Sequence, residues 1–184
     1  FAGSFNLAAR DLLLSYLAYF RAQRSASSAD LPLSLATALD SCISVAALAV
    51  SVLMAGSGDL PSHRAILPLS SRSDASYGHH MACSMALGFL FLGGGRYTLS
   101  NSPPAIAALL CSLYPIFPKA PGEQRYHHQA LRHLWVLAAT PRCLVARDIF
   151  TNEAILLPLS LRSIAPDWQS DFHYPTVAPA LVPS

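Results

Sequence analysis

The stretch from Met81 to Gly95 contains no charged side chain, so a helix there would have no face suited to water. Such a helix is expected to be buried on all sides. Small and large residues alternate irregularly along it, which lets neighbouring helix backbones approach closely. Three glycines, Gly93, Gly94 and Gly95, then predict the end of the helix, because glycine enters left-handed backbone conformations at little steric cost.

A second copy of this pattern lies earlier in the chain. An apolar run that ends near residue 55 is followed by Gly56 and Gly58, and Gly56 aligns with Gly93, 37 residues later. A third, weaker copy has Ala139 to Pro141 in place of the glycines. Helix-pair repeats of roughly 35–45 residues are typical of solenoids, in which no unit buries its apolar face alone. The pattern therefore predicts helical hairpins.

The rest of the chain up to residue 141 divides by the same signals into helices and connections. The predicted elements are an amphipathic helix at 5–24 capped by Ser4 or Asn6, a helix at 31–55 that starts with Asp30 and Pro32 and is stopped by Pro61, a loop at 61–77, a helix that begins with Ser102 and Pro103 and ends at Tyr114, and a helix at 125–139. In this last helix an apolar face is expected opposite a wet face, with Ala130, Leu134, Leu137 and Ala138 facing away from His128, Arg132 and His133.

Beyond Pro141 the periodicity changes. RCLVARDI and EAILLPLSL flank the turn residues Phe150, Thr151 and Asn152, which indicates a β-hairpin. The predicted organisation is therefore an N-terminal helix and linker at 1–30, helical repeats at 31–141, a β-hairpin segment at 142–162 and a Pro-rich, disordered tail at 163–184.

Composition limits the classes of partner. Hydrophobic residues make up 53% of the chain and charged residues 12%, against roughly 25% charged in an average soluble domain, so much of the surface is expected to meet protein. A net charge of +2 is too small for a nucleic-acid footprint. The four cysteines lack the spacing of a zinc or redox motif, and we expect buried free thiols in a reducing compartment at Cys42, Cys83, Cys111 and Cys143.

A membrane span is the main alternative from another class. The longest charge-free run, residues 41–56, is shorter than the roughly 20 apolar residues that a span needs. The run that ends at Gly95 would place an open turn inside hydrocarbon, where unpaired backbone groups are costly. The pattern therefore favours no membrane association.

Cofactor and catalytic motifs are weak. Gly88 and Gly93 have phosphate-loop spacing, but Gly94 and Gly95 replace the required Lys and Ser/Thr. Adjacent helical histidines point about 100° apart, so helix-end polar contacts are favoured over a metal site for His79, His80, His127, His128 and His133. We therefore predict no catalytic, cofactor-binding or metal-binding residue and no cofactor, and treat the glycines Gly56, Gly58, Gly93, Gly94 and Gly95 as structural repeat turns.

The segment MALGFLFLGGGRYTLSNSPPAIAALLCSLYP, followed by YHHQALRHLWVLAATPR, resembles the proteasome/cyclosome repeat region of the largest subunit of the anaphase-promoting complex. The resemblance covers residues 36–157. It implies a solenoid or toroid of paired helices followed by a β-rich segment, to which DIFTNEAI is similar. The implied function is that of a non-catalytic scaffold in a cell-cycle E3 ubiquitin ligase.

The partners that the resemblance implies are the other subunits of the complex, its coactivator and its degron co-receptor, in the nucleus and cytoplasm, with no nucleic acid and no membrane. A non-ATPase scaffold subunit of the proteasome regulatory particle shares the alternation of small and large residues and remains an alternative. The run GRYTLSNSPPAIAALLCSLYP fits the cyclosome subunit better. A small helical membrane protein remains the competitor from a different class.

Overall fold

A computed structural model describes residues 1–26, 32–123, 128–144, 148–151, 153 and 155, together with the short strands at 158–159, 176–177 and 180–181. The chain divides into two compact units, Phe1–Thr140 and Pro141–Pro183. The first unit is helical and the second carries short strands, which confirms the predicted mainly α fold with a small β part.

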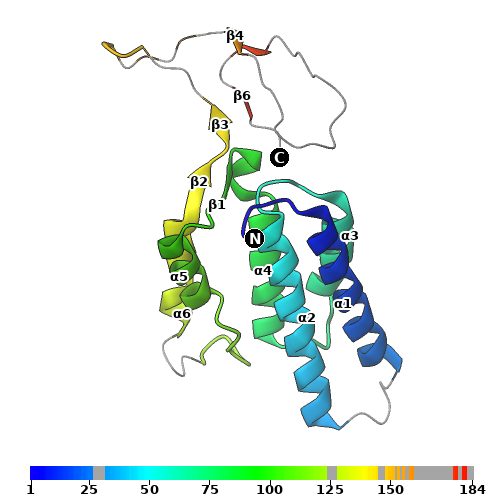
Figure 1. Ribbon diagram of the computed structural model, residues 1–184. Helices are drawn as coiled ribbons and strands as arrows, with labels where there is room; N and C mark the ends of the chain where they lie inside the picture. The colour runs from blue at the N-terminus through cyan, green and yellow to red at the C-terminus, as the bar shows by residue number, and fades with distance from the viewer. Residues whose placement is uncertain are drawn as a thin grey trace. The chain divides into compact units, whose positions relative to one another are not determined.

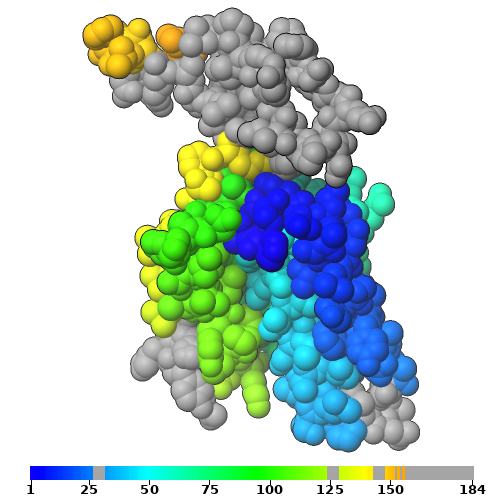
Figure 2. Space-filling view, viewed as in Figure 1, coloured from blue at the N-terminus to red at the C-terminus, as the bar shows by residue number. Residues whose placement is uncertain are grey.

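Helical hairpins build the first unit. Its helices are α1 (Leu7–Ala26), α2 (Leu33–Leu53), α3 (Leu60–Ser70), α4 (Tyr77–Leu90), α5 (Pro103–Ser112) and α6 (His128–Leu131), with 3₁₀ helices η1 (Leu92–Gly95) and η3 (Arg132–Ala138). Successive helices run in opposite directions (Figure 1). The main packed pairs are α1 with α2, α3 with α4, α5 with η3, and α2 with α4. In the space-filling view α1 and α2 lie side by side, in blue and cyan (Figure 2).

The core lies between α2 and α4. Small side chains at this contact, among them Ala47 and Ala86, are fully buried, and Val50 and Leu90 fill the remaining space. This close approach agrees with the small-residue pattern of the sequence. The expectation that α4 is buried on all sides was wrong for one stripe, because Ser84 and Gly88 are exposed.

Helix α2 is, within the described residues, the one helix long and apolar enough to cross a membrane by length and composition. Asp40 lies inside it and forms ion pairs with Arg24 and Arg72. The core helix of a soluble protein passes the same test.

The sequence analysis named candidate residues for the starts of the first two helices. Before α1, the Asn6 side chain, and not that of Ser4, accepts a hydrogen bond from the Ala9 N–H at 2.9 Å. Asp30, expected at the start of the second helix, lies outside the described residues.

Helix α3 corrects the prediction of a loop at 61–77. Asp59 is its N-cap, and one carboxylate oxygen accepts hydrogen bonds from the N–H of Ser62 at 3.0 Å and from its hydroxyl at 2.6 Å. Pro61 lies in the first turn, where the missing N–H has no intrahelical acceptor to lose. Pro61 therefore begins a helix, whereas the sequence analysis expected it only to stop one.

The segment predicted as a helix at 125–139 is α6 followed by the 3₁₀ helix η3. The expected faces were wrong at Arg132, which is 5% exposed, and at Leu137, which is 72% exposed, whereas Ala138 is buried as expected. A 3₁₀ helix has three residues per turn, so side-chain directions drift away from those of the 3.6-residue pattern assumed from the sequence. His133 is exposed, and the side chain of His128 lies outside the described part.

Strand β1 (Tyr97–Leu99) pairs with β2 (Ala139–Pro141). The Ser100 N–H also donates to the Ala138 carbonyl oxygen at 2.8 Å. Residues 139–141 were expected to replace the glycines of a helix-end turn, which was wrong: Ala139 has φ −68° and ψ 132°, an extended conformation. Residues with a Cβ do not readily take the left-handed conformation, and here they continue as a strand.

In the second unit β3 (Cys143–Leu144) pairs with β6 (Ala180–Leu181), and β4 (Pro158–Leu159) pairs with β5 (Thr176–Val177), both antiparallel. A turn is present at the predicted residues Phe150 and Thr151, since the Asp148 N–H donates to the Glu153 carbonyl oxygen at 3.0 Å, while the third predicted turn residue, Asn152, lies outside the described residues. The described strands on either side pair with residues near 180, not with each other. Strands β5 and β6 belong to 163–184, which was predicted to be disordered; its other residues lie outside the described part.

Candidate functional site

The predicted turn glycines share a left-handed backbone conformation. Their φ values are +76° for Gly56, +64° for Gly58, +56° for Gly93, +63° for Gly94 and +84° for Gly95. A residue with a Cβ pays roughly 1–2 kcal/mol in this region. These are the backbone conformations expected of glycine turns at the ends of α2 and α4.

The turn after α2 completes the end of α4. The N–H of Gly56 donates to the Phe89 carbonyl oxygen, and the N–H of Gly58 donates to the Leu90 carbonyl oxygen, both at 2.9 Å. The last carbonyl groups of a helix have no partner within the helix itself. The glycine turn of one hairpin thus supplies the donors that the neighbouring hairpin lacks.

The end of α2 is completed in the same way by the N-terminal segment. The N–H of Gly3 donates to the Val52 carbonyl oxygen at 2.9 Å, and the N–H of Phe5 donates to the Leu53 carbonyl oxygen at 3.2 Å. Gly3 has φ +61° and Phe5 has φ +54°. The sequence analysis missed Gly3, although an isolated glycine just before a helix start was a usable signal.

The glycine positions differ in the space around them. A Cβ at Gly56 would collide with the Tyr97 carbonyl oxygen, and one at Gly3 with that of Leu99. A Cβ at Gly94 would meet nothing within 4 Å, so at Gly94 only the backbone conformation requires glycine. Gly56 is therefore required by both conformation and space.

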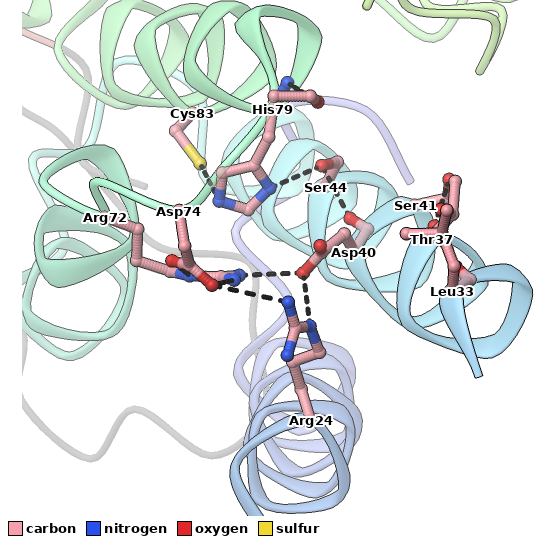
Figure 3. A network of polar contacts seen from close by, with 11 residues as sticks. Arg24, Leu33, Thr37, Asp40, Ser41, Ser44, Arg72, Asp74, His79 and Cys83 are labelled. Carbon is pink, nitrogen blue, oxygen red and sulfur yellow. Dashed lines mark hydrogen bonds and ion pairs between the residues drawn. The ribbon is translucent and has the colours of Figure 1, made fainter. Parts of the chain in front are cut away.

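A closed ring of ion pairs joins α1, α2 and the connection between α3 and α4 (Figure 3). Arg72 contacts Asp40 and Asp74 at 2.8 Å each, and Arg24 contacts the same two carboxylates at 3.3 Å each. The hydrogen bond from Arg72 holds the pKa of Asp74 below its usual value, and the same bond raises the pKa of Arg72. The ring links the last turns of α1 to α2 and to the α3–α4 connection.

His79 extends this network into the core (Figure 3). It is 2% exposed; its Nδ1 lies 3.0 Å from Ser44 Oγ and its Nε2 lies 3.5 Å from Cys83 Sγ. Since Ser44 Oγ donates to the Asp40 carbonyl oxygen, it accepts from Nδ1–H, which leaves Nε2 to accept from the thiol. Burial, followed by the charge of Arg72, lowers the pKa of His79, and burial raises the pKa of Cys83 to about 11.

Arg132 closes the end of α5. Its guanidinium donates to the backbone carbonyl oxygens of Ser112, Tyr114 and Ile116, at 3.2, 3.3 and 2.5 Å. Its Cζ lies 4.4 Å from the ring centroid of Phe117, a cation–π contact. Burial lowers the pKa of Arg132. A side chain expected on a wet face therefore performs the role that glycine turns perform for α2 and α4.

A separate ion pair fixes the start of α3. Arg10 of α1 lies 2.9 Å from the N-cap carboxylate of Asp59. Burial opposes ionisation of Asp59, but hydrogen bonds from Ser62 and Arg10 outweigh it and hold its pKa below the ordinary value. The N-cap thus connects α1 to α3 as well as starting the helix.

The predicted histidine and cysteine positions do not form one site. His80 Nδ1 lies 3.1 Å from the Ser70 carbonyl oxygen, a helix-end contact, while His127 lies outside the described residues. Within the described residues no three His, Cys, Asp or Glu side chains are grouped as metal ligands. Cys42, Cys83 and Cys111 are free thiols. Cys111 is exposed, which contradicts the expectation of burial.

Comparison with known proteins gives one consistent result. A family model described as the APC1 fifth domain matches residues 1–140. The chain is 47% identical over 146 residues to anaphase-promoting complex subunit 1 of Dictyostelium discoideum (78% of this chain, 6% of that protein). It is 44% identical over 187 residues to subunit 1 of Homo sapiens (100% and 9%) and 46% identical over 164 residues to a negative regulator of mitosis of Emericella nidulans (88% and 8%). The chain spans less than a tenth of the length of these relatives.

Proposed function

Because the chain belongs to the family of the APC1 fifth domain, we propose that it acts as a non-catalytic scaffold segment of the anaphase-promoting complex, a cell-cycle E3 ubiquitin ligase. The proposal rests on family membership at 44–47% identity and on how the described polar groups are used. Ubiquitin transfer would be performed by other subunits.

The observation that carries a scaffold function is the bonding between successive hairpins. The turn that contains Gly56 and Gly58 completes α4, and the segment that contains Gly3 completes α2. The Gly56 turn thus joins the first hairpin to the second by backbone hydrogen bonds, and the Gly3 segment closes α2 within the first hairpin, so the array resists bending at these points. A rigid array is suited to holding other subunits at fixed positions.

The proposed partners are the other subunits of the complex, its coactivator and its degron co-receptor, met in the nucleus and cytoplasm. We propose no nucleic-acid partner, since a net charge of +2 gives no strong basic surface. The free thiols at Cys42, Cys83 and Cys111 agree with a reducing compartment.

The test is the native mass of the assembly that copurifies with a tagged protein carrying this chain. A megadalton complex that contains cullin and RING subunits is the expected result. A complex of proteasome subunits would instead support the proteasome alternative, which the family match does not favour. A monomeric species would contradict both scaffold readings.

The membrane alternative has one supporting observation, the length and mean hydropathy of α2. Against it, Asp40 inside α2 is bonded to two arginines of neighbouring segments, and α2 supplies much of the core. Flotation with lipid vesicles separates the two hypotheses, because the scaffold proposal expects the protein to stay at the bottom of the gradient.

A further inference from the structure

A cavity of about 360 Å³ lies between the last turns of α1 and the end of α3. Three arginines, Arg21, Arg24 and Arg72, line it, and apolar side chains that include Ile43 and Leu69 form its remaining wall. Two of the arginines belong to the ion-pair ring of Figure 3. None of the glycine turns takes part, so this cavity is separate from the helix-end bonds described above.

The arginines of the cavity are unequally satisfied. Arg72 makes short contacts, at 2.8 Å to Asp40 and at 2.8 and 3.1 Å to Asp74. Arg24 makes longer contacts, 3.3 Å from its Nε to Asp40 and 3.3 Å from its Nη2 to Asp74, and the buried Nε meets Asp40 without forming a well-aligned hydrogen bond. Arg21 donates to the Ala65 carbonyl oxygen at 3.5 Å. The two arginines of α1 are therefore held by longer contacts than Arg72 is.

The charge of the cavity is also unbalanced. Asp40 and Asp74 neutralise two of the three guanidinium groups, which leaves one positive charge in surplus. Arg21 and Arg24 are three residues apart on α1, so they share one side of the helix as like charges. One bound carboxylate would neutralise the surplus positive charge and would accept hydrogen bonds from the guanidinium groups of both arginines.

We propose that this cavity binds one aspartate or glutamate carboxylate of a partner peptide, between Arg21 and Arg24, with an apolar neighbouring side chain against Ile43 and Leu69. The volume exceeds what a carboxylate alone fills and lies in the range of small-ligand pockets. The proposal deepens the scaffold function by giving the chemistry of one partner contact, and it rests on that function.

The experiment uses the 184-residue chain labelled with ¹⁵N-arginine and follows the Nε–H signals by NMR. The probe is N-acetyl-aspartyl-leucine amide, with the asparaginyl peptide as its uncharged match. We expect saturable shifts of the Arg21 and Arg24 signals with the first peptide and none with the second. Arg21→Gln should weaken binding about tenfold and Arg21→Lys less, since lysine keeps the charge and loses the fork. Arg64→Gln, at an exposed position of α3, should leave binding unchanged.

Two kinds of result would overturn the proposal. Shifts that do not saturate, or that are as large at Arg64 as at Arg21, would show general screening and no site. Tighter binding of the phosphoseryl peptide, or binding of inorganic phosphate as tight as that of the aspartyl peptide, would assign the cavity to phosphate. Because the chain is tested alone, failure here is distinct from failure of the copurification experiment.

Discussion

The N–H of Gly56, in the turn after α2, donates to the carbonyl oxygen of Phe89, in the last turn of α4, at 2.9 Å. Gly56 and Gly93 are the equivalent glycines of two repeats, 37 residues apart in sequence. A Cβ on Gly95 would lie 3.4 Å from the Gly56 carbonyl oxygen, so the two turns are neighbours in space. The glycine turn of the first repeat thus completes the helix that ends at the glycine turn of the second.

Gly56→Ala should be strongly destabilising. Alanine would have to adopt a left-handed backbone conformation, which costs roughly 1–2 kcal/mol. Its Cβ would also collide with a backbone oxygen, which cannot move aside as the end of a flexible side chain can. We expect a loss of about 3 kcal/mol or more in the free energy of unfolding. Urea denaturation of the chain, followed by circular dichroism, measures it.

Two other glycines provide the controls. Gly94→Ala has the strained conformation but open space, so it should cost roughly 1 kcal/mol. Gly122→Ala has neither feature and should lie within about 0.5 kcal/mol of the unmodified chain. Equal losses of unfolding free energy for the two alanine variants at Gly56 and Gly94 would show that the collision with the Tyr97 carbonyl oxygen costs nothing.

Features set by a few adjacent residues could be predicted from the sequence. The positive φ of the turn glycines could be expected from local backbone chemistry, and so could a cap before the first helix, although the choice between Ser4 and Asn6 could not. Helix α3 was missed because Pro61 was interpreted as the residue that stops the preceding helix. In the structure Asp59 caps a new helix, and Pro61 lies in the first turn of that helix. The cap depends on three neighbouring residues whose signal was present but outweighed by the prolines and serines around it.

The buried position of Arg132 could not be predicted in the same way. Its acceptors lie 16–20 residues earlier, at the end of α5, so no local pattern reports them. The ion-pair ring has the same origin, since Arg24, Asp40 and Arg72 come from three different helices or their ends. These charged residues become internal links only through tertiary packing.

Arg132→Met should loosen the third hairpin. Methionine roughly preserves the volume but leaves the carbonyl groups of Ser112, Tyr114 and Ile116 without these donors, at about 2–4 kcal/mol in total. Hydrogen exchange should therefore accelerate in α5 and η3 before it does so in α2. His133→Met, at the exposed neighbouring position, is the control and should leave exchange unchanged. Uniform acceleration in every helix would contradict a local role.

Stability should fall below neutral pH because of His79. Its pKa is lowered in the folded state, while an unfolded histidine titrates near pH 6.5. Between the two pKa values the unfolded chain binds more protons, so this contribution is complete above about pH 6.5 and is lost as the pH falls through the folded pKa. His79→Gln should flatten the dependence of the unfolding free energy on pH just below about pH 6.5. An unchanged slope in His79→Gln would assign the pH dependence to other groups.

The last prediction concerns Gly94 within the proposed ligase. A Cβ there meets nothing within 4 Å, so the main effect of valine is expected from a β-branched residue in a left-handed conformation after α4. Gly94→Val should lower the amount of intact complex, because the turn and the end of α4 are strained, while the ubiquitination activity per assembled complex stays near normal. Gly122→Val, at an open position without positive φ, should change neither quantity. If Gly94→Val assembled fully and lost activity, the glycine turn would belong to a functional contact, and its assignment as a purely structural turn would have to be abandoned.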